Sequence, residues 1–358
     1  MTSRIDLQLR KAKSGLSFLS SGFVALDVLE GQGGRLAAAG GSCGNVTAIM
    51  AWLGWPSATI ARLGADQAGN IVSEDLSAVG VSLKYLRREN GARTPIVLQR
   101  FVQSADGTRR HRFSLVCPEC GAWLPRFRSV VLSHAAEVME GKAPTAFYFD
   151  RVSPAIVRTA VWARDCGALV IFEPSSIPDD PLFQRAVETC HILKYSDERL
   201  GRTAELAEAR QPSLVIHTRG AAGLRVRWRG RWSDLQAFQV PRVLDAAGSG
   251  DWCTAGILHV LCQPGSGSSV LEKARKTDVE RALRLGQALA AVNCAFEGAR
   301  GLMYAASRDR LNRMLSRLAG GHGSLPDDVQ VERRQSVDLC SLCAEASRGS
   351  TATMRHVG

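Results

Sequence analysis

The sequence has no apolar run of the roughly 18 to 20 residues that a membrane-spanning helix requires. Its N-terminus, MTSRIDLQLRKAKSG, is basic but lacks the apolar segment that follows in a secretory signal. Aromatic residues are scarce, and no basic stripe is interleaved with aromatic side chains on which bases could stack. We therefore expect a cytoplasmic protein that does not cross a membrane and for which nucleic acid is not the expected partner.

Acidic residues are also in short supply. The chain has 45 Lys and Arg residues against 34 Asp and Glu residues, which gives a net charge of +11 at pH 7. The arginines are scattered, with local groups at 109–112 and 225–231, rather than gathered in one stripe. A positive field of this kind suits an enzyme that handles polyanionic nucleotides.

Histidine spacing typical of metal sites is missing, so cysteines are the candidate metal ligands. A cytoplasmic compartment keeps thiols reduced, and four of the ten cysteines form two Cys-x-x-Cys pairs, Cys117 with Cys120 and Cys340 with Cys343. Each pair is half of a tetrahedral Zn²⁺ site, so the two could share one structural zinc ion. The second pair could instead be two thiols on a helix, and redox pairing is a third interpretation. The remaining cysteines have neighbours typical of a core: Cys43, Cys166, Cys190, Cys253, Cys262 and Cys294.

What the sequence does contain is a regular alternation of apolar strands and helical patterns. The expected strands lie at 56–64, 94–102, 145–152, 167–175, 190–195 and 212–220. Helical spacing is found at 69–80, 154–166, 181–189 and 203–210. This alternation indicates an α/β fold with a mostly parallel central sheet and helices on both faces. Two segments, 94–116 and 221–240, are expected to be β-hairpins with turns at Asp106-Gly107 and Arg229-Gly230.

The stretch DAAGSGD at 245–251 has small residues between two carboxylates, just before an apolar helix. Small residues at a helix start leave N–H groups able to bind an anion, where the helix dipole also favours negative charge. Such a nest could steady a phosphoryl group in transfer, and Asp251 at its mouth could take a proton from an alcohol. Asp245 is better placed to order the loop or a cation. Asp251 could equally be a helix cap, and the stretch alone does not decide.

A second glycine-rich turn, GGSCGNVTAIMAWLG at 40–54, opens another apolar helix and is followed by Gly64, Asp66 and Gly69. In this order the two signatures resemble those of the ribokinase-like (PfkB) carbohydrate kinase family, over roughly residues 15 to 316. The resemblance implies a ribokinase-like fold with a small β-lid over the sugar. It also implies transfer of phosphate from ATP to a hydroxyl of a sugar or nucleoside, with Mg²⁺ and, as a further ion, K⁺.

The resemblance also implies a role for each matching position. Asp251 matches the catalytic base, and the anion hole is implied at the backbone N–H groups of Ala247, Gly248, Ser249 and Gly250. Sugar contacts are implied at Asp27, Gly41 and Asn45, with Asp150 and Arg151 as further candidates at a strand end. Nucleotide contacts are implied at Thr218, Gly220, Gly223 and Gln287, and contacts on the phosphate side at Asp245 and Glu198.

The segment CHILKYSDERL at 190–200 departs from the family pattern, which has Asn-x-x-Glu here to organise Mg²⁺. Tyr195 or Ser196 stands in the Asn place, and Glu198 or Arg199 in the Glu place, depending on register. The alternative to a kinase is therefore a kinase-like protein that binds a nucleotide or sugar, has weak or no activity and acts through interaction.

The resemblance divides the chain into three parts. These are an N-terminal arm (1–15), a kinase domain (16–316) with lid parts near 27–45 and 92–120, and a C-terminal tail (317–358) that carries the second cysteine pair. The tail is rich in Gly, Ser and charged residues, a composition typical of a linker. Because the lid of the family often carries a dimer contact, a homodimer through the lid is a further expectation.

Overall fold

The computed structural model describes residues 7–31, 34–103, 109–176, 178, 180–197, 212–240, 242–262, 267–320 and 335–343. Within them, ten strands form a central sheet in the order β14-β13-β12-β11-β10-β9-β1-β4-β5, with β6 paired to β4. Neighbours are parallel except at β13 and β14, which are antiparallel. The strands are β1 (Phe18–Ser21), β4 (Ser57–Gly64), β5 (Val81–Ser82), β6 (Leu86–Glu89), β9 (Ala146–Phe149), β10 (Leu169–Phe172), β11 (Ile192–Ser196), β12 (Leu214–Thr218), β13 (Leu224–Trp228) and β14 (Arg231–Leu235).

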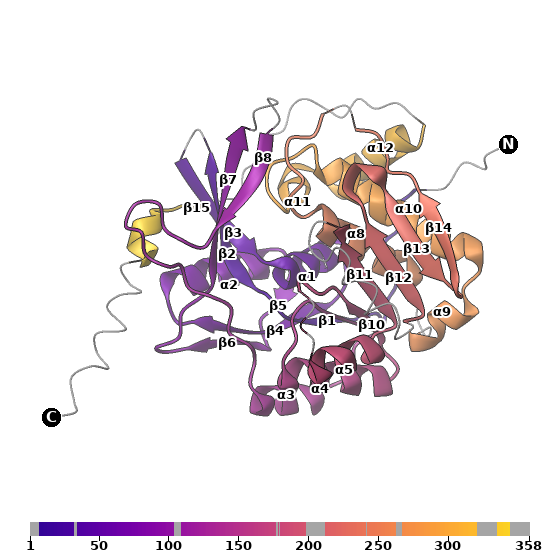
Figure 1. Ribbon diagram of the computed structural model, residues 1–358, viewed down its shortest axis with the longest axis horizontal. Coiled ribbons are helices and arrows are strands. Elements are labelled where there is room, and N and C mark those ends of the chain that lie inside the picture. Colours follow the sequence, from indigo (N-terminus) through magenta and orange to yellow (C-terminus); the bar gives the residue numbers. More distant parts are fainter. Residues whose placement is uncertain are drawn as a thin grey trace.

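Helices cover both faces of this sheet (Figure 1). One face carries α1 (Ser42–Trp52), α2 (Gln67–Ala78), α8 (Ser249–Leu261), α10 (Lys276–Asn293) and α12 (Arg308–Ala319), and the other α3 (Leu132–Met139), α4 (Pro154–Asp165) and α5 (Pro181–Thr189). Shorter pieces are α9 (Val270–Lys273), α11 (Gly301–Ala305), η2 (Gly220–Ala222) and η3 (Gly267–Ser269). No described helix has both the length and the apolar character needed to cross a membrane.

The central strands are apolar on both faces because a helix layer lies on each side. In β9, Tyr148 faces the layer of α1 and α8, whereas Phe147 and Phe149 face the layer of α3, α4 and α5. Such strands, buried on both faces, are typical of a parallel sheet. Pro154 and Pro181 each stand in the first turn of a helix, behind a capping side chain, and so set where α4 and α5 begin.

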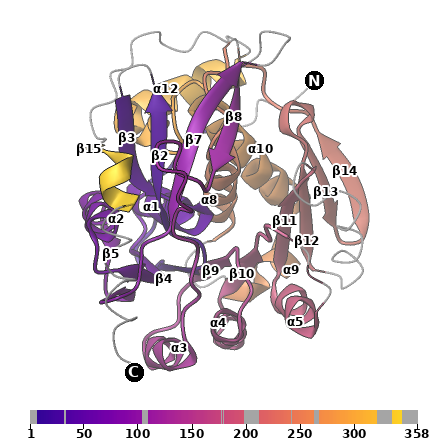
Figure 2. The ribbon, with the colours of Figure 1, turned by 60° about the vertical axis from the view of Figure 1, so that its left-hand side comes forward.

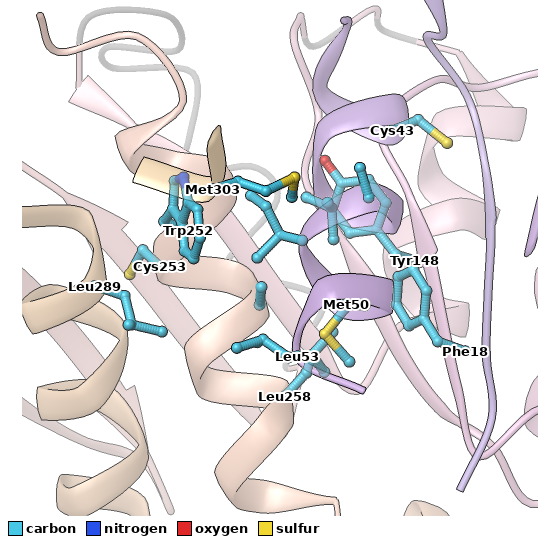
Figure 3. Close-up of a cluster of buried hydrophobic side chains, with 14 of the residues drawn as sticks. Phe18, Cys43, Met50, Leu53, Tyr148, Trp252, Cys253, Leu258, Leu289 and Met303 are labelled. Carbon is cyan, nitrogen blue, oxygen red and sulfur yellow. The ribbon is translucent and has the colours of Figure 1, made fainter. Parts of the chain in front are cut away.

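Close packing of α1, α8 and α10 fixes the glycine-rich helix starts relative to one another. Trp252 of α8 is fully buried in the cluster that Figure 3 shows. Its ring meets that of Trp52 of α1 edge-on, with 5.6 Å between the ring centroids. The helices α8 and α10 approach so closely that a Cβ atom on Gly256 would lie 2.8 Å from Cα of Gly286. The two signatures, one before α1 and one before α8, are therefore held in a rigid relation.

A second, smaller sheet stands beside α1 and α2 (Figure 2). Its order is β15-β3-β2-β7-β8, with β15 (Gln335–Ser336), β3 (Gly34–Gly40), β2 (Ala25–Gly31), β7 (Ile96–Gln103) and β8 (Arg109–Ser114). Of these pairs, β2 and β7 are parallel and the others antiparallel. Arg300 is buried and donates from Nη2 to the Ala39 carbonyl and to Asp75 of α2, which ties the sheet to the body.

The six expected strands and three of the four expected helices are present, whereas the helix expected at 203–210 lies outside the described residues. The hairpin at 221–240 is β13 and β14, and its turn residues Arg229 and Gly230 both have positive φ, 50° and 72°, as a two-residue hairpin turn of the favoured type requires. The first hairpin is β7 and β8, and its expected turn at Asp106-Gly107 lies outside the described residues.

Two expectations about the chain need correction. Helix α12 continues to Ala319 because its apolar face is buried, so the tail boundary expected at 317 falls inside a helix. Cys166, expected in the core, is exposed because it caps the C-terminal end of α4. Part of the expected tail also returns to the folded body, since β15 pairs with β3.

Candidate active site

The loop before α8 is held by Asp245, which is 2% exposed. One carboxylate oxygen accepts the Ala247 N–H at 2.7 Å, and the other accepts the Gly298 N–H at 2.6 Å. Gly248 then caps α8 with φ of 71°, and a Cβ atom on it would lie 2.1 Å from the Ala299 carbonyl oxygen. Both features require glycine. Asp245 therefore orders the loop through hydrogen bonds within the protein.

Two of the four expected anion-binding N–H groups have other partners in this structure. The Ala247 N–H bonds to Asp245, and the Ser249 N–H bonds to the Ala246 carbonyl at 3.2 Å. Among the described residues no acceptor is found for the N–H groups of Gly248 and Gly250. The expectation of four N–H donors is corrected to these two, because the turn uses the other two to shape itself.

Asp251 lies in the first turn of α8 and is 8% exposed. Its Oδ2 accepts a hydrogen bond from the Asn45 side-chain amide at 2.9 Å, which joins the two signatures across the sequence. Asn45 is on the first turn of α1, whose cap residue Gly41 has φ of 75° and no room for a side chain beside the Phe23 carbonyl. The Asn45 Oδ1 atom is buried and has no protein partner among the described residues.

Asp27 of β2 lies beside Gly41, the residue that caps α1. Its Oδ2 accepts a hydrogen bond from the Gln99 amide of β7 at 2.9 Å, and the carboxyl also accepts the Gly41 N–H. Burial raises the pKa of Asp27 from 3.8 to about 7, an effect that the charge of Arg300 and these two hydrogen bonds oppose. Gly40 is required here, because a Cβ atom on it would overlap the Asp27 carboxyl group.

Asp150 and Arg151 follow β9 at the carboxyl edge of the sheet. Asp150 is buried, and its Oδ1 accepts the Phe23 N–H at 2.8 Å. Arg151 donates to the Asp150 carbonyl at 2.9 Å and to its carboxylate at 3.3 Å. The Arg151 guanidinium lies over the ring of Phe23, 4.7 Å from its centroid, and near Phe127. The Phe23 carbonyl in turn accepts N–H groups at the start of α1, so both residues border the same site.

The expected nucleotide residues gather at the end of β12 and around β14. The Thr218 hydroxyl donates to the Tyr195 carbonyl at 3.3 Å, which aligns the ends of β11 and β12. Gly223 has φ of 94°, and a Cβ atom on it would lie 2.1 Å from the Leu235 carbonyl oxygen. The Gln287 amide of α10 donates at 3.3 Å to the carbonyls of Leu235 and Gln236, and its Oε1 is buried without a protein partner among the described residues. Gly220 begins η2, and Glu198 lies outside the described residues.

The two cysteine pairs meet away from these groups, at the base of the small sheet. The sulfur atoms of Cys117, Cys120 and Cys340 all lie within 4.8 Å of one another. The Cys343 thiol forms hydrogen bonds with Cys117 and Cys120. The two halves expected from the sequence are therefore side by side.

Comparison with known proteins identifies this arrangement. The model of the pfkB family carbohydrate kinases matches residues 27–304, which is most of the chain and spans both glycine-rich signatures. The chain belongs to this family. It is a carbohydrate kinase, an enzyme that transfers phosphate to a sugar hydroxyl.

A curated relative and two solved structures show how far the likeness extends. A fructokinase of Escherichia coli is 28% identical over 284 residues, which cover 72% of this chain and 88% of that protein. The solved structure of aminoimidazole riboside kinase from Salmonella enterica, with aminoimidazole riboside and an ATP analogue, superimposes with a TM-score of 0.62 at 19% identity, covering 84% of this chain and all of that one. Arabidopsis thaliana ribokinase, with ribose and ATP, gives 0.61 at 18% identity, with coverages of 84% and 98%. The expected ribokinase-like fold is confirmed.

Sequence reasoning missed a buried ion pair of this kinase beside the helix start. Lys194 of β11 is 1% exposed, and its Nζ lies 2.5 Å from Oε1 of Glu173. Thr254 of α8 donates to the other Glu173 oxygen at 2.9 Å. The Lys194 Nζ lies 3.4 Å from the point where a Cβ atom on Gly250 would stand. A lysine inside a strand pattern is usually solvent-exposed, and only its apolar neighbours, Leu193 and Tyr195, signal burial.

Proposed function

We propose that this kinase transfers the γ-phosphoryl group of ATP to a hydroxyl group of a sugar, with fructose as the first candidate and Asp251 as the base. The observation that carries the proposal is the hydrogen bond between Asn45 and Asp251 at the start of α8. It orients a nearly buried carboxylate beside N–H groups able to bind an anion, which is the pairing that transfer to an alcohol requires. The fructokinase relative supports the choice of fructose.

In the proposed reaction, Asp251 accepts the proton of the attacking hydroxyl as the oxygen–phosphorus bond forms. The N–H groups of Gly248 and Gly250, at the positive end of α8, stabilise the charge on the transferring group. Lys194 adds a fixed positive charge close to Gly250. The Asn45 Oδ1 accepts a second sugar hydroxyl, and Asp27 with Arg151 holds the remainder of the sugar.

Mg²⁺ would enter with ATP and supply charge neutralisation at its phosphates. Both carboxylate oxygens of Asp245 and of Glu173 already accept hydrogen bonds within the protein. These two side chains therefore fit contact with Mg²⁺ through a water molecule rather than direct coordination. Thr218, Gly223 and Gln287 line the side of the site that would hold the nucleotide. We propose K⁺ as a further ion because the family resemblance implies it. The use of ATP favours the cytoplasm as the place of reaction.

We also propose that two copies of the chain associate through the small sheet. Its edge at β3 is occupied by β15, which leaves β8 as the outer strand on the other side. Large apolar side chains are exposed on and after β8: Phe113 is 56%, Leu115 41% and Trp123 62% exposed. Exposed apolar side chains next to an outer strand favour association with another sheet.

Phosphorylation of fructose and of a panel of other sugars and nucleosides, with ATP, Mg²⁺ and K⁺, tests the function. Asp251→Asn should lower kcat by about 100- to 10,000-fold, because general-base catalysis contributes this much. Its ATP affinity should be unchanged. Asp309→Asn, an exposed aspartate on α12, is the matched control and should keep full activity.

Unchanged turnover in Asp251→Asn would refute the role of the base. Binding of sugar and ATP without turnover of any substrate would instead favour the second candidate, a kinase-like protein that acts through interaction. The altered segment at 190–200, in which Ser196 or Tyr195 replaces the family's asparagine, is the observation that keeps this candidate open.

A further inference from the structure

Four cysteines from two distant parts of the chain, 117–120 and 340–343, converge on one point. The sulfur atoms of Cys117, Cys120 and Cys340 lie within 4.8 Å of one another. The Cys343 thiol forms hydrogen bonds with the thiols of Cys117 and Cys120. A tetrahedral Zn²⁺ site with sulfur ligands at about 2.3 Å places sulfurs at comparable separations. The candidate ligand atoms of this group are thiols, and the Glu119 carboxylate beside them forms a hydrogen bond with the Cys340 thiol.

The first half of the group is a tight hairpin after β8. Val116 and Trp123 form a bridge, and the Cys117 N–H donates to the Ala122 carbonyl at 2.8 Å. Gly121 closes the turn with φ of 71°, a conformation that glycine adopts without strain. The backbone N–H groups of Glu119 and Cys120 point at the Cys117 sulfur. The backbone of this hairpin therefore holds the first pair of cysteines in place.

The second half is the helical turn at 339–343, which follows β15. Cys340 and Cys343 are three positions apart and so lie on one face of the turn. The other face is anchored, since Leu339 is fully buried and Leu342 is 5% exposed in the main core. The Cys340 N–H donates to the Asp338 carboxylate at 3.0 Å, which sets the start of the turn. The thiols of Cys340 and Cys343 are therefore directed toward Cys117 and Cys120 without a bound metal.

The charges around the group are compatible with four thiolates on a divalent cation, a centre with net negative charge. Arg93 is close enough to Cys343 to interact with its charge. Arg35 of β3 pairs with Glu119, which lies between the first two cysteines. Soft thiolate ligands in a tetrahedral set select Zn²⁺ over Mg²⁺ and Ca²⁺.

We propose that Cys117, Cys120, Cys340 and Cys343 bind one structural Zn²⁺ ion, which fastens residues 335–343 to the small sheet. The four thiols release their protons and each donates an electron pair to the ion, without any change of oxidation state. The clamp holds β15 against the edge of β3, next to β2 with its sugar-binding Asp27. The ion would therefore keep β15 paired with β3 at this edge of the small sheet.

Metal analysis of the purified full-length protein tests the proposal. The wild-type chain should carry about one zinc ion, and Cys117→Ser and the double variant Cys340→Ser/Cys343→Ser should carry none. Cys166→Ser, which removes an exposed cysteine elsewhere, is the control and should keep its zinc. Replacing zinc by Co²⁺ should give the absorption spectrum of a tetrahedral cobalt–thiolate centre in the wild type and not in the double variant.

Because a cysteine variant could lose zinc by failing to fold, the wild-type protein treated with a chelator provides a second test without any substitution. Removal of zinc should expose the backbone amides of β3 and β15 to hydrogen exchange, and added Zn²⁺ should restore their protection. Wild-type protein without stoichiometric zinc, whether its thiols are free or joined in disulfides, would overturn the proposal. Zinc retained in the Cys340→Ser/Cys343→Ser variant would overturn the shared site, and exchange unaffected by the chelator would overturn the clamp.

Discussion

At the scale of single residues, Asp27 shows how the site sets its own pH dependence. Burial between β2, β7 and the start of α1 raises its pKa to about 7, although Arg300, Gly41 and Gln99 all favour the charged form. The ionised carboxylate can accept hydrogen bonds from sugar hydroxyls at both oxygens, whereas protonation turns one oxygen into a donor. The proposed sugar contact therefore gains its charge as the pH rises through about 7.

We predict that KM for the sugar falls, by up to about tenfold, as the pH rises from about 6 to about 8. Asp27→Asn should remove this pH dependence and raise KM, with a smaller effect on kcat. Initial rates over a series of fructose concentrations at each pH provide the measurement. A pH-independent KM in the wild type would argue against an ionisable sugar contact at Asp27.

The same residue affects stability with a defined sign. The folded protein binds the Asp27 proton more tightly than the unfolded chain, because its pKa is raised from 3.8 to about 7. Its contribution to the free energy of unfolding is therefore fully present below pH about 4 and is lost as the pH rises to about 7. Chemical denaturation should show a weaker pH dependence in Asp27→Asn than in Asp309→Asn over this range.

Sequence reasoning singled out residues that belong to short local signatures. Asp251, Asn45 and Asp27 belong to short glycine-rich signatures, and the structure brings them together at the start of α1. It failed for Lys194, which lies on β11, and for Glu173, which follows β10, because no spacing in the sequence links them. It also overcounted the N–H donors of the nest, because the hydrogen bonds inside a turn depend on its exact dihedral angles.

At the scale of elements, the turn before α8 depends on Gly248 for two separate reasons. Its φ of 71° lies in the left-handed region, and a Cβ atom would collide with the Ala299 carbonyl at 2.1 Å. Gly230, in the turn between β13 and β14, has nearly the same φ of 72°, but a Cβ atom on it would meet nothing within 4 Å. A side chain at Gly230 would therefore cost only the energy of a left-handed backbone, whereas a side chain at Gly248 would add the energy of a steric clash.

We predict that Gly230→Ala lowers the free energy of unfolding by about 1–2 kcal/mol, the cost of a left-handed residue. Gly248→Ala should lower it by about 1–3 kcal/mol more, because the packed backbone must move. It should also lower kcat, since the N–H groups of the nest would shift. Denaturation by urea and fructose phosphorylation give the two quantities. Equal losses of stability in both variants would mean that the loop before α8 yields without strain.

Elements with long, regular patterns were predicted from the sequence, whereas short ones were not. Apolar strands such as β10 and β12 were found because a parallel sheet buries both of their faces. The strand β15 contributes only Gln335 and Ser336, both exposed, and no periodicity exists in two residues. Its position is set by Leu339, Leu342 and the neighbouring cysteines, contacts that are invisible to a local pattern.

At the scale of the whole molecule, the sequence predicted the two-sheet plan but not how the ends of the chain are used. The segment after α12 closes one edge of the small sheet at β3 and leaves β8 as the opposite edge. Phe113 of β8, Leu115 directly after it and Trp123 have exposed side chains. Association of two chains through β8 would bury this surface, because β15 already occupies the opposite edge of the small sheet.

We predict that the protein is a dimer in solution and that Phe113→Glu/Trp123→Glu makes it monomeric, because a buried carboxylate without a partner opposes association. Trp232→Glu, which changes an exposed tryptophan of β14 on the other side of the molecule, should leave the dimer intact. Light scattering during size-exclusion chromatography gives the mass of each species. The Phe113→Glu/Trp123→Glu monomer should retain its zinc, because the four cysteines come from one chain. A monomeric wild type at micromolar concentration, or a variant that stays dimeric, would exclude association through β8.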